Sequence, residues 1–299
     1  MRWIRNYTPR PDQDRLYHKA LAITIVGNLV LAISKGLVAY YSGSAALYAD
    51  AANSASDVLY SLLMVLGLWM AQRPPDLSHP QGHSRFEPLV GLAVSFSMGF
   101  AGYEAVHTAI ERFQTGGIVV APLLPTLVLL SSAAVKGGMF VYIRRLSQVL
   151  NSPTLATTAQ DNLSDVLTSI AAVAGVYGSH LIHPLADPVA GLLVAAWIFR
   201  AAARAAIENL GFLTGAGASP ELRQQIVTMA ASVPGVQHVH HMMSEYVGPQ
   251  LVVDLHINVD GQMTLNEAHA ISDSVAEKLQ ELPEVDRAYV HIEPDGWID

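Results

Sequence analysis

The feature that most constrains this chain is a long apolar region, from about residue 21 to about residue 210, with aspartates inside it. A helix needs roughly 20 mainly apolar residues to cross a membrane. The region divides into six such segments, at about 16–41, 45–72, 87–113, 118–146, 155–181 and 186–212. Only 14% of the 299 residues are charged, against about 25% in soluble domains. The sequence therefore predicts an α-helical membrane protein with six transmembrane helices in a domain over residues 1–212.

Residues 213–299 have the composition of a separate soluble domain. Helical patterns over 220–231 and 265–282 alternate with strand patterns over 238–246, 250–259 and 287–293. The order α-β-β-α-β suits a small α+β domain, an open sheet with helices on one face. Lys and Arg gather before the first apolar segment, between the second and third, and late in the fourth and sixth. Such a bias predicts that both termini, and with them this domain, are cytoplasmic.

Two of the apolar segments carry carboxylates in their interiors. Asn53 and Asp57 lie in the second segment, and Asp161 and Asp165 lie in the fifth. A spacing of four places each pair on one face of a helix, one turn apart. Ionisable groups inside a membrane are costly and usually mark an ion path, and three carboxylates repel one another unless a cation lies between them. This pattern predicts a site for a divalent metal ion, with helix–helix hydrogen bonding as the alternative.

Two further groups of metal-ligand residues lie outside the apolar segments. Asp76, His79 and His83 fall within eight residues between the second and third segments. Six of the twelve histidines lie between residues 238 and 291, where strand faces from different segments could converge. A polar interfacial loop and ordinary surface histidines are the alternatives. The absence of cysteine excludes disulfides and thiolate ligands, and the net charge of −8 argues against a nucleic-acid partner.

Together these segments resemble the cation diffusion facilitator family. The matching stretches are residues 43–57 (GSAALYADAANSASD), 79–87 (HPQGHSRFE), 161–165 (DNLSD), 234–236 (PGV) and 290–294 (VHIEP). The resemblance implies a homodimeric metal/proton antiporter of the plasma or inner membrane. It also implies a cytoplasmic domain with a metallochaperone-like fold, serving regulation and dimerisation.

The resemblance also implies three sets of site residues. In the membrane it implies Asn53, Asp57, Asp161 and Asp165, in the loop Asp76, His79 and His83, and in the soluble domain His240, His256, His269, His291 and Glu293. The intramembrane set is similar to that of the manganese-exporting branch. The oxygen ligands alone also suit Mn(II), whereas the histidines leave Zn(II) open for the loop and domain sites.

These observations predict a transporter and not an enzyme. The expected activity is export of Mn(II) by alternating access, with metal ions, protons, membrane lipid and a second copy of the chain as partners. A Zn(II) or Fe(II) exporter of the same family is the alternative. A membrane-bound metalloenzyme is a more distant one, since the sequence offers no cofactor motif.

Overall fold

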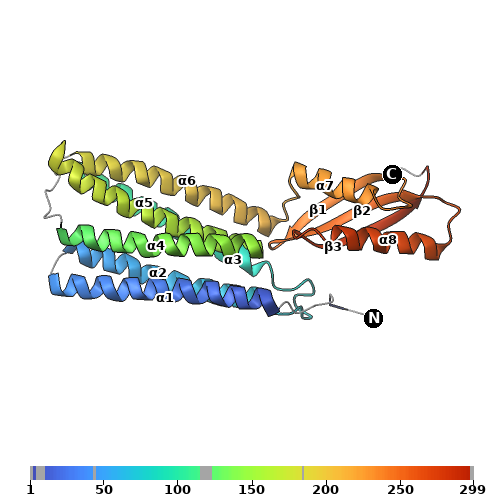
Figure 1. The fold of residues 1–299 in the computed structure, drawn as a ribbon, viewed down its shortest axis with the longest axis horizontal. Coiled ribbons are helices and arrows are strands. Elements are labelled where there is room, and N and C mark those ends of the chain that lie inside the picture. Colours follow the sequence, from blue (N-terminus) through green and yellow to red (C-terminus); the bar gives the residue numbers. More distant parts are fainter. Residues whose placement is uncertain (1–2, 5–10, 43–44, 115–122, 184, 297–299) are drawn as a thin grey trace. The chain divides into compact units, whose positions relative to one another are not determined.

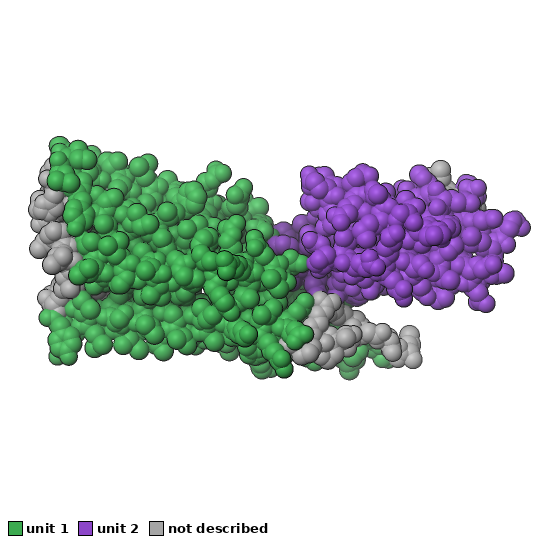
Figure 2. Space-filling model, in the orientation of Figure 1, with its two compact units in different colours: residues 1–209 green, residues 210–299 purple. Residues whose placement is uncertain are grey.

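The computed structural model describes residues 3–4, 11–42, 45–114, 123–183 and 185–296. The chain forms two compact units, residues 1–209 and residues 210–299 (Figure 2). Within the described residues, the first unit consists of six long helices that run side by side (Figure 1). They are α1 (Pro11–Ser42), α2 (Ala45–Ala71), α3 (Phe86–Gln114), α4 (Leu123–Leu150), α5 (Pro153–Leu181) and α6 (Ala186–Thr214), the last of which extends into the second unit.

The helical membrane region predicted from the sequence is confirmed. Among the described residues, four stretches are long and apolar enough to cross a membrane: Asp12–Val38, Phe86–Gln114, Thr126–Leu150 and Pro188–Thr214. Helix α2 adds a shorter apolar stretch, Asp57–Ala71. The two helices that are absent from the four, α2 and α5, are those whose apolar runs are interrupted by Asn, Ser and Asp.

Helices α1, α2, α4 and α5 share an apolar core. Helix α1 packs against α2 and α4, and α5 packs against α4 and α3. Polar pairs cross between the helices: Asn28 of α1 donates to Ser61 of α2 at 2.8 Å, and Asn209 of α6 donates to Thr157 of α5 at 2.9 Å. Such hydrogen bonds help to fix helices that have little hydrophobic driving force between them in lipid.

One buried carboxylate joins three of the helices near their ends. Glu87, in the first turn of α3, is 4% exposed and accepts hydrogen bonds from the hydroxyls of Tyr17 on α1, at 3.2 Å, and of Ser152. Ser152 is also the N-cap of α5, and its hydroxyl accepts from the backbone N–H of Leu155. The hydroxyl of Thr154 donates to the backbone carbonyl of Glu87. The start of α5 is thus tied to α3 through both side chain and backbone.

The second unit contains the predicted α+β domain. Its elements are α7 (Pro220–Ala231), β1 (His238–Val247), β2 (Gln250–Val259), α8 (Leu265–Leu279) and β3 (Val285–Pro294). Strand β2 lies in the centre, antiparallel to β1 and parallel to β3. One face of β2 is buried against α7 and α8. The element order is as predicted, except that α8 ends at Leu279, three residues early, because Gln280 caps it.

Local sequence signals account for these boundaries. Ser219 caps α7, and Thr264 forms a capping box with Glu267 at the start of α8. The turn between β1 and β2 has only Gly248 and Pro249 between the paired ends, and Gly248 adopts a φ of 67°, which glycine tolerates best. The capping hydrogen bonds from Thr264 lower the pKa of Glu267.

We expect Glu87→Ala to destabilise the membrane unit. The change leaves the hydroxyls of Tyr17 and Ser152 without their shared acceptor, and each buried polar group left unsatisfied costs roughly 1–3 kcal/mol. The measurement is the thermal unfolding midpoint of the full chain in detergent micelles. Glu104→Ala, an exposed glutamate on the same helix, is the control. Equal midpoints for the two variants would contradict the structural role of Glu87.

Candidate functional site

A buried ion pair joins three membrane helices where the sequence predicts a metal site. Nζ of Lys136, on α4, lies 2.9 Å from Oδ2 of Asp57 on α2 and 2.7 Å from Oδ2 of Asp165 on α5. The lysine side chain is 4% exposed, and the aspartates are 18% and 28% exposed. Two of the predicted carboxylates therefore lie at one point, together with the ammonium of Lys136, which the sequence did not predict as part of the site.

The other two predicted intramembrane ligands are Asp161 and Asn53. Asp161 lies one turn before Asp165 on α5 and interacts electrostatically with Asp57, Asp165 and Lys136. Asn53 belongs to α2, but its side chain lies outside the described residues. Three of the four predicted residues thus act on the same buried point.

Hydrogen bonds fix the turn of α2 that carries Asp57. The hydroxyl of Ser61 donates to the backbone carbonyl of Asp57 at 2.7 Å and accepts from Asn28 of α1 at 2.8 Å. Ser54, on the preceding turn of α2, is also buried. These polar side chains hold α2 in place on the side that faces α1.

Two buried lysines were not among the residues predicted for this site. Lys136 contacts the carboxylates directly, and Lys35 of α1, which is 8% exposed, acts on Asp57 through its charge. Each is a basic residue in the interior of an apolar helix, which is a signal in the sequence. The expectation that the carboxylates need a metal ion for compensation is therefore incomplete. Lys136 and Lys35 offset part of the negative charge of the three carboxylates.

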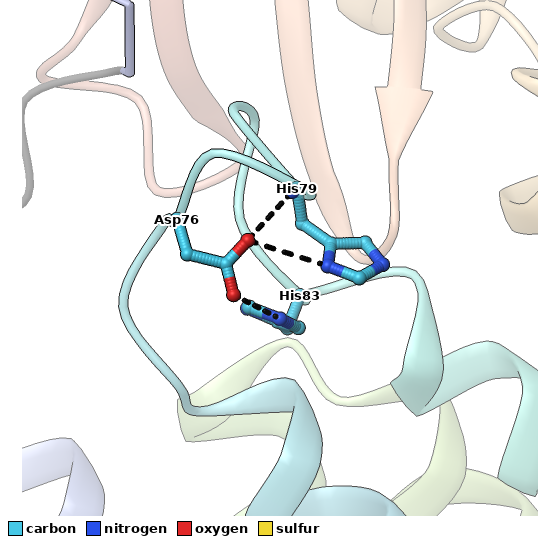
Figure 3. A group of neighbouring side chains, drawn as sticks. All are labelled: Asp76, His79 and His83. Carbon is cyan, nitrogen blue, oxygen red and sulfur yellow. Dashed lines mark hydrogen bonds and ion pairs between the residues drawn. The ribbon is translucent and has the colours of Figure 1, made fainter.

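The loop between α2 and α3 brings together its three predicted residues (Figure 3). Oδ1 of Asp76 accepts the backbone N–H of His79 at 2.7 Å, and the ring nitrogens of His79 and His83 lie 3.5 Å from its two oxygens. The imidazole centroids are 4.4 Å apart. Gly82 permits this fold-back with a φ of 94°. One ligand atom from each residue lies within 4.8 Å of the others, which is a geometry that could hold a metal ion.

The second histidine group lies on the open face of the C-terminal sheet. Strand pairing places His256 beside His291 and Asn258 beside Glu293. Residues two apart on a strand share a face, so these side chains lie opposite the face of β2 that is buried under the helices. Three residues from three strands form the tight part of the group: His240, His256 and Glu293.

A bulge in β1 brings His240 into this group. The pairing with β2 shifts between Val239 and His241, so His240 is the extra residue. A bulge interrupts strict alternation and re-aims a side chain. Nε2 of His240 lies 3.1 Å from Oε2 of Glu293, and the imidazole is 6% exposed. The simple alternation expected from the sequence could not anticipate this placement.

Three polar atoms of this group are buried and face one another. Within the described part of the chain, Nε2 of His240, Nδ1 of His256 and Oε2 of Glu293 make no hydrogen bond. Nδ1 of His256 lies 3.3 Å from the other carboxylate oxygen, Oε1. Buried polar groups are nearly always satisfied, so converging unsatisfied nitrogen and oxygen atoms fit a missing cation. The donor set, two imidazoles and one carboxylate, suits Zn(II) or a similar ion.

One residue outside the predicted set orients the group. Oδ1 of Asn258 lies 2.9 Å from Nδ1 of His240, and its Nδ2 donates to the backbone carbonyl of Pro294 at 3.3 Å. The amide thus engages one ring nitrogen of His240 and leaves the other directed at Glu293. Such second contacts fix the tautomer and orientation of metal-binding histidines.

The remaining two predicted domain residues lie further from this centre. His291 is 61% exposed, with Nε2 at 3.5 Å from Oε1 of Glu293. His269, on α8, is 73% exposed and faces Asp273 at 3.6 Å. His291 therefore borders the group, and His269 is not brought into it within this single chain.

Two family models match the chain across both units. The model described as "Cation efflux transmembrane domain" matches residues 21–214, and the model described as "Cation efflux protein, cytoplasmic domain" matches residues 218–295.

Named relatives align along most of the chain. It is 33% identical over 279 residues to "Uncharacterized transporter MJ0449" of Methanocaldococcus jannaschii, covering 93% of this chain and 99% of the relative. It is 32% identical to "Magnetosome protein MamM" of Paramagnetospirillum magneticum, covering 83% of this chain and 79% of that protein. It is 26% identical to "Manganese efflux system protein MneS" of Bacillus subtilis, covering 95% and 98%.

We expect the Asp76 carboxylate to remain ionised below the pH at which an ordinary aspartate takes up its proton. The backbone N–H of His79 chiefly lowers the pKa of Asp76. A lowered pKa in the folded state stabilises the loop above the pKa of the unfolded chain, about 3.9, and that contribution is lost as the pH falls through the folded value. The measurement is a pH titration of the carboxyl ¹³C signal in the full chain, assigned by comparison with Asp76→Asn. A midpoint at or above 3.9 would contradict the loop geometry.

Proposed function

The chain belongs to the cation efflux family, whose members transport divalent metal ions and are not enzymes, and on that premise we propose that it exports Mn(II) in exchange for protons. The ion is bound by Asn53, Asp57, Asp161 and Asp165, between α2 and α5. The observation that carries this proposal is the convergence of Asp57 and Asp165 on one buried point. Their Oδ2 atoms lie 2.9 and 2.7 Å from Nζ of Lys136.

The proposed identity of the ion follows from the donor atoms. Three carboxylates and one amide offer oxygen atoms as ligands. Oxygen is a hard donor, and hard donors suit Mn(II) better than Zn(II). The relative named for manganese efflux, MneS, supports the same choice. Zn(II) or Fe(II) is the alternative cargo, and the histidines at the two other groups keep zinc in consideration for the chain as a whole.

The proposed mechanism is alternating access. The ion enters from the cytoplasmic side and takes the place between α2 and α5. Protons from the opposite side then bind the aspartates, which weakens metal ligation because the carboxylates must be deprotonated to act as ligands. The export of metal and the import of protons are thereby linked at the same oxygen atoms.

The loop group and the sheet group are proposed as accessory metal sites. Asp76, His79 and His83 form the first, and His240, His256 and Glu293 form the centre of the second, with His291 beside it. In this proposal Zn(II) or Mn(II) at these sites regulates transport. The protein lies in the plasma or inner membrane as a homodimer, with both termini and the C-terminal domain in the cytoplasm. The predicted ligand His269 has no place in the sheet group within one chain, so its role as a ligand is not part of the proposed centre.

The test of the transport site is Mn(II) uptake by proteoliposomes with an acidic interior. Asp57→Ala and Asp161→Ala are each expected to reduce uptake to the level of empty vesicles, because each removes a ligand and a negative charge. Asp12→Ala, an exposed aspartate at the start of α1, serves as the control and should transport normally. The same assay across Mn, Zn, Fe, Co and Cd identifies the cargo, and Asp161→His should shift the preference toward zinc. Retained Mn(II) uptake by Asp57→Ala would end the assignment.

The sheet group has its own test in the full chain. In an Asp76→Ala, Asp161→Ala background, calorimetric titration with Zn(II) or Mn(II) reports the C-terminal group alone. We expect His240→Ala to abolish that binding and Asn258→Ala to weaken it by about 10–100-fold, the usual effect of losing a residue that orients a ligand. Asn266→Ala, an exposed asparagine of the same domain, should leave it unchanged. Unaltered affinity in Asn258→Ala would show that His240 needs no such support.

A further inference from the structure

The ammonium of Lys136 occupies the place that a transported ion would need. Its Nζ lies 2.9 Å from Oδ2 of Asp57 and 2.7 Å from Oδ2 of Asp165. Divalent ions hold oxygen ligands at about 2.0–2.6 Å, so an ion bridging the same two oxygens would lie almost where Nζ lies. Two cations cannot share that position, since their repulsion in a low-dielectric surrounding is large.

We propose that Lys136 is a tethered internal cation that substitutes for the transported ion whenever the site is empty, and that metal binding requires displacement of its ammonium. The proposal rests on the proposed transport function of Asp57 and Asp165. In this proposal Lys136 alternates with the metal ion as the partner of the two carboxylates. The lysine remains a cation throughout, and only its position changes.

Replacement of the ion by the ammonium of Lys136 lowers the energetic cost of the empty site. In the proposed cycle the site is empty only after the protons have left toward the cytoplasm and before the next ion binds, and carboxylates without a partner in a membrane interior are costly at that stage. Pairing with Lys136 offsets part of that cost at Asp57 and Asp165. The lysine side chain is a flexible four-carbon stem with a compact charge at its end. Rotation about the bonds of this stem can therefore move the ammonium while the α4 backbone stays in place.

The same competition provides selection by charge. A monovalent ion carries no more charge than the ammonium it would displace, and it lacks the advantage of a covalent tether. A divalent ion gains about twice the Coulomb energy at the same distance. Lys136 is therefore expected to act as a specificity-determining residue that excludes Na⁺ and K⁺ from the carboxylates. Lys35, whose charge also acts on Asp57, lowers the affinity for every cation without occupying the site.

The experiment measures Mn(II) affinity in the purified full chain, in an Asp76→Ala, His240→Ala background that removes the other two groups. Lys136→Met is expected to bind Mn(II) on the order of tenfold or more tightly, because two partly buried carboxylates lose their competing partner. Its binding should also become sensitive to Na⁺. In proteoliposomes its turnover should fall, because the more tightly bound ion is released more slowly. Lys35→Met, the matched control, removes a second buried membrane lysine and should raise the affinity less.

Three results would overturn the proposal: unchanged or weaker Mn(II) binding by Lys136→Met, an equal gain in Lys35→Met, or continued indifference to Na⁺. If Lys136→Met does not elute as a monodisperse species, Lys136→Arg decides. Its guanidinium pairs with carboxylates in two-pronged fashion, so it should bind Mn(II) more weakly than the unmodified background, and equal or tighter binding overturns the proposal. Failure of the proposed function is separate: the background itself would then show no Mn(II) binding that Asp161→Ala removes.

Discussion

Charge compensation inside the membrane unit governs the arrangement of its helices. Asp57, Lys136 and Asp165 come from α2, α4 and α5, and none of them could lie in an apolar interior without the others. The ion pair therefore fixes how these three helices face one another. Hydrogen bonds from α1 and α6 to α2 and α5 reinforce the same arrangement without adding charge. The apolar core supplies packing, but the ionic contact determines register.

The intramembrane carboxylates and the sheet group differ in the charges that surround them. Two of the intramembrane carboxylates, Asp57 and Asp165, are already paired with Lys136, so part of the negative charge of this site is compensated by the protein itself. In the sheet group no lysine or arginine is among the residues that the structure places against Glu293, and the carboxylate faces the imidazoles of His240 and His256 at 3.1 and 3.3 Å. A site with a built-in competitor favours reversible binding, whereas a site of unsatisfied buried atoms favours retention of an ion.

The sequence predicted what depends on local pattern. Elements of the C-terminal domain follow caps, alternation and the turn at Gly248, and the loop group follows from close spacing. The pairing of Lys136 with Asp57 joins residues 79 positions apart, which no periodicity encodes. The bulge at His240 changes which side chains share a face, and the role of Asn258 depends on that bulge. The features that the sequence did not predict are contacts between different helices or strands, whereas the predicted features arise within single elements.

The intramembrane site and the sheet group have different requirements, which is why one chain can combine carboxylate ligands at the first with histidines at the second. A transported ion must be released, so its site needs an affinity that can be overcome at each cycle. In the proposed mechanism, competition from Lys136 and protonation of the aspartates both lower that affinity at the same oxygen atoms. A regulatory ion, as proposed for the sheet group, has the opposite requirement, and an imidazole held in place by Asn258 would suit it. In this proposal the cargo is selected by the intramembrane carboxylates and by the lysine that competes for them, whereas the histidines of the sheet group select a regulatory ion.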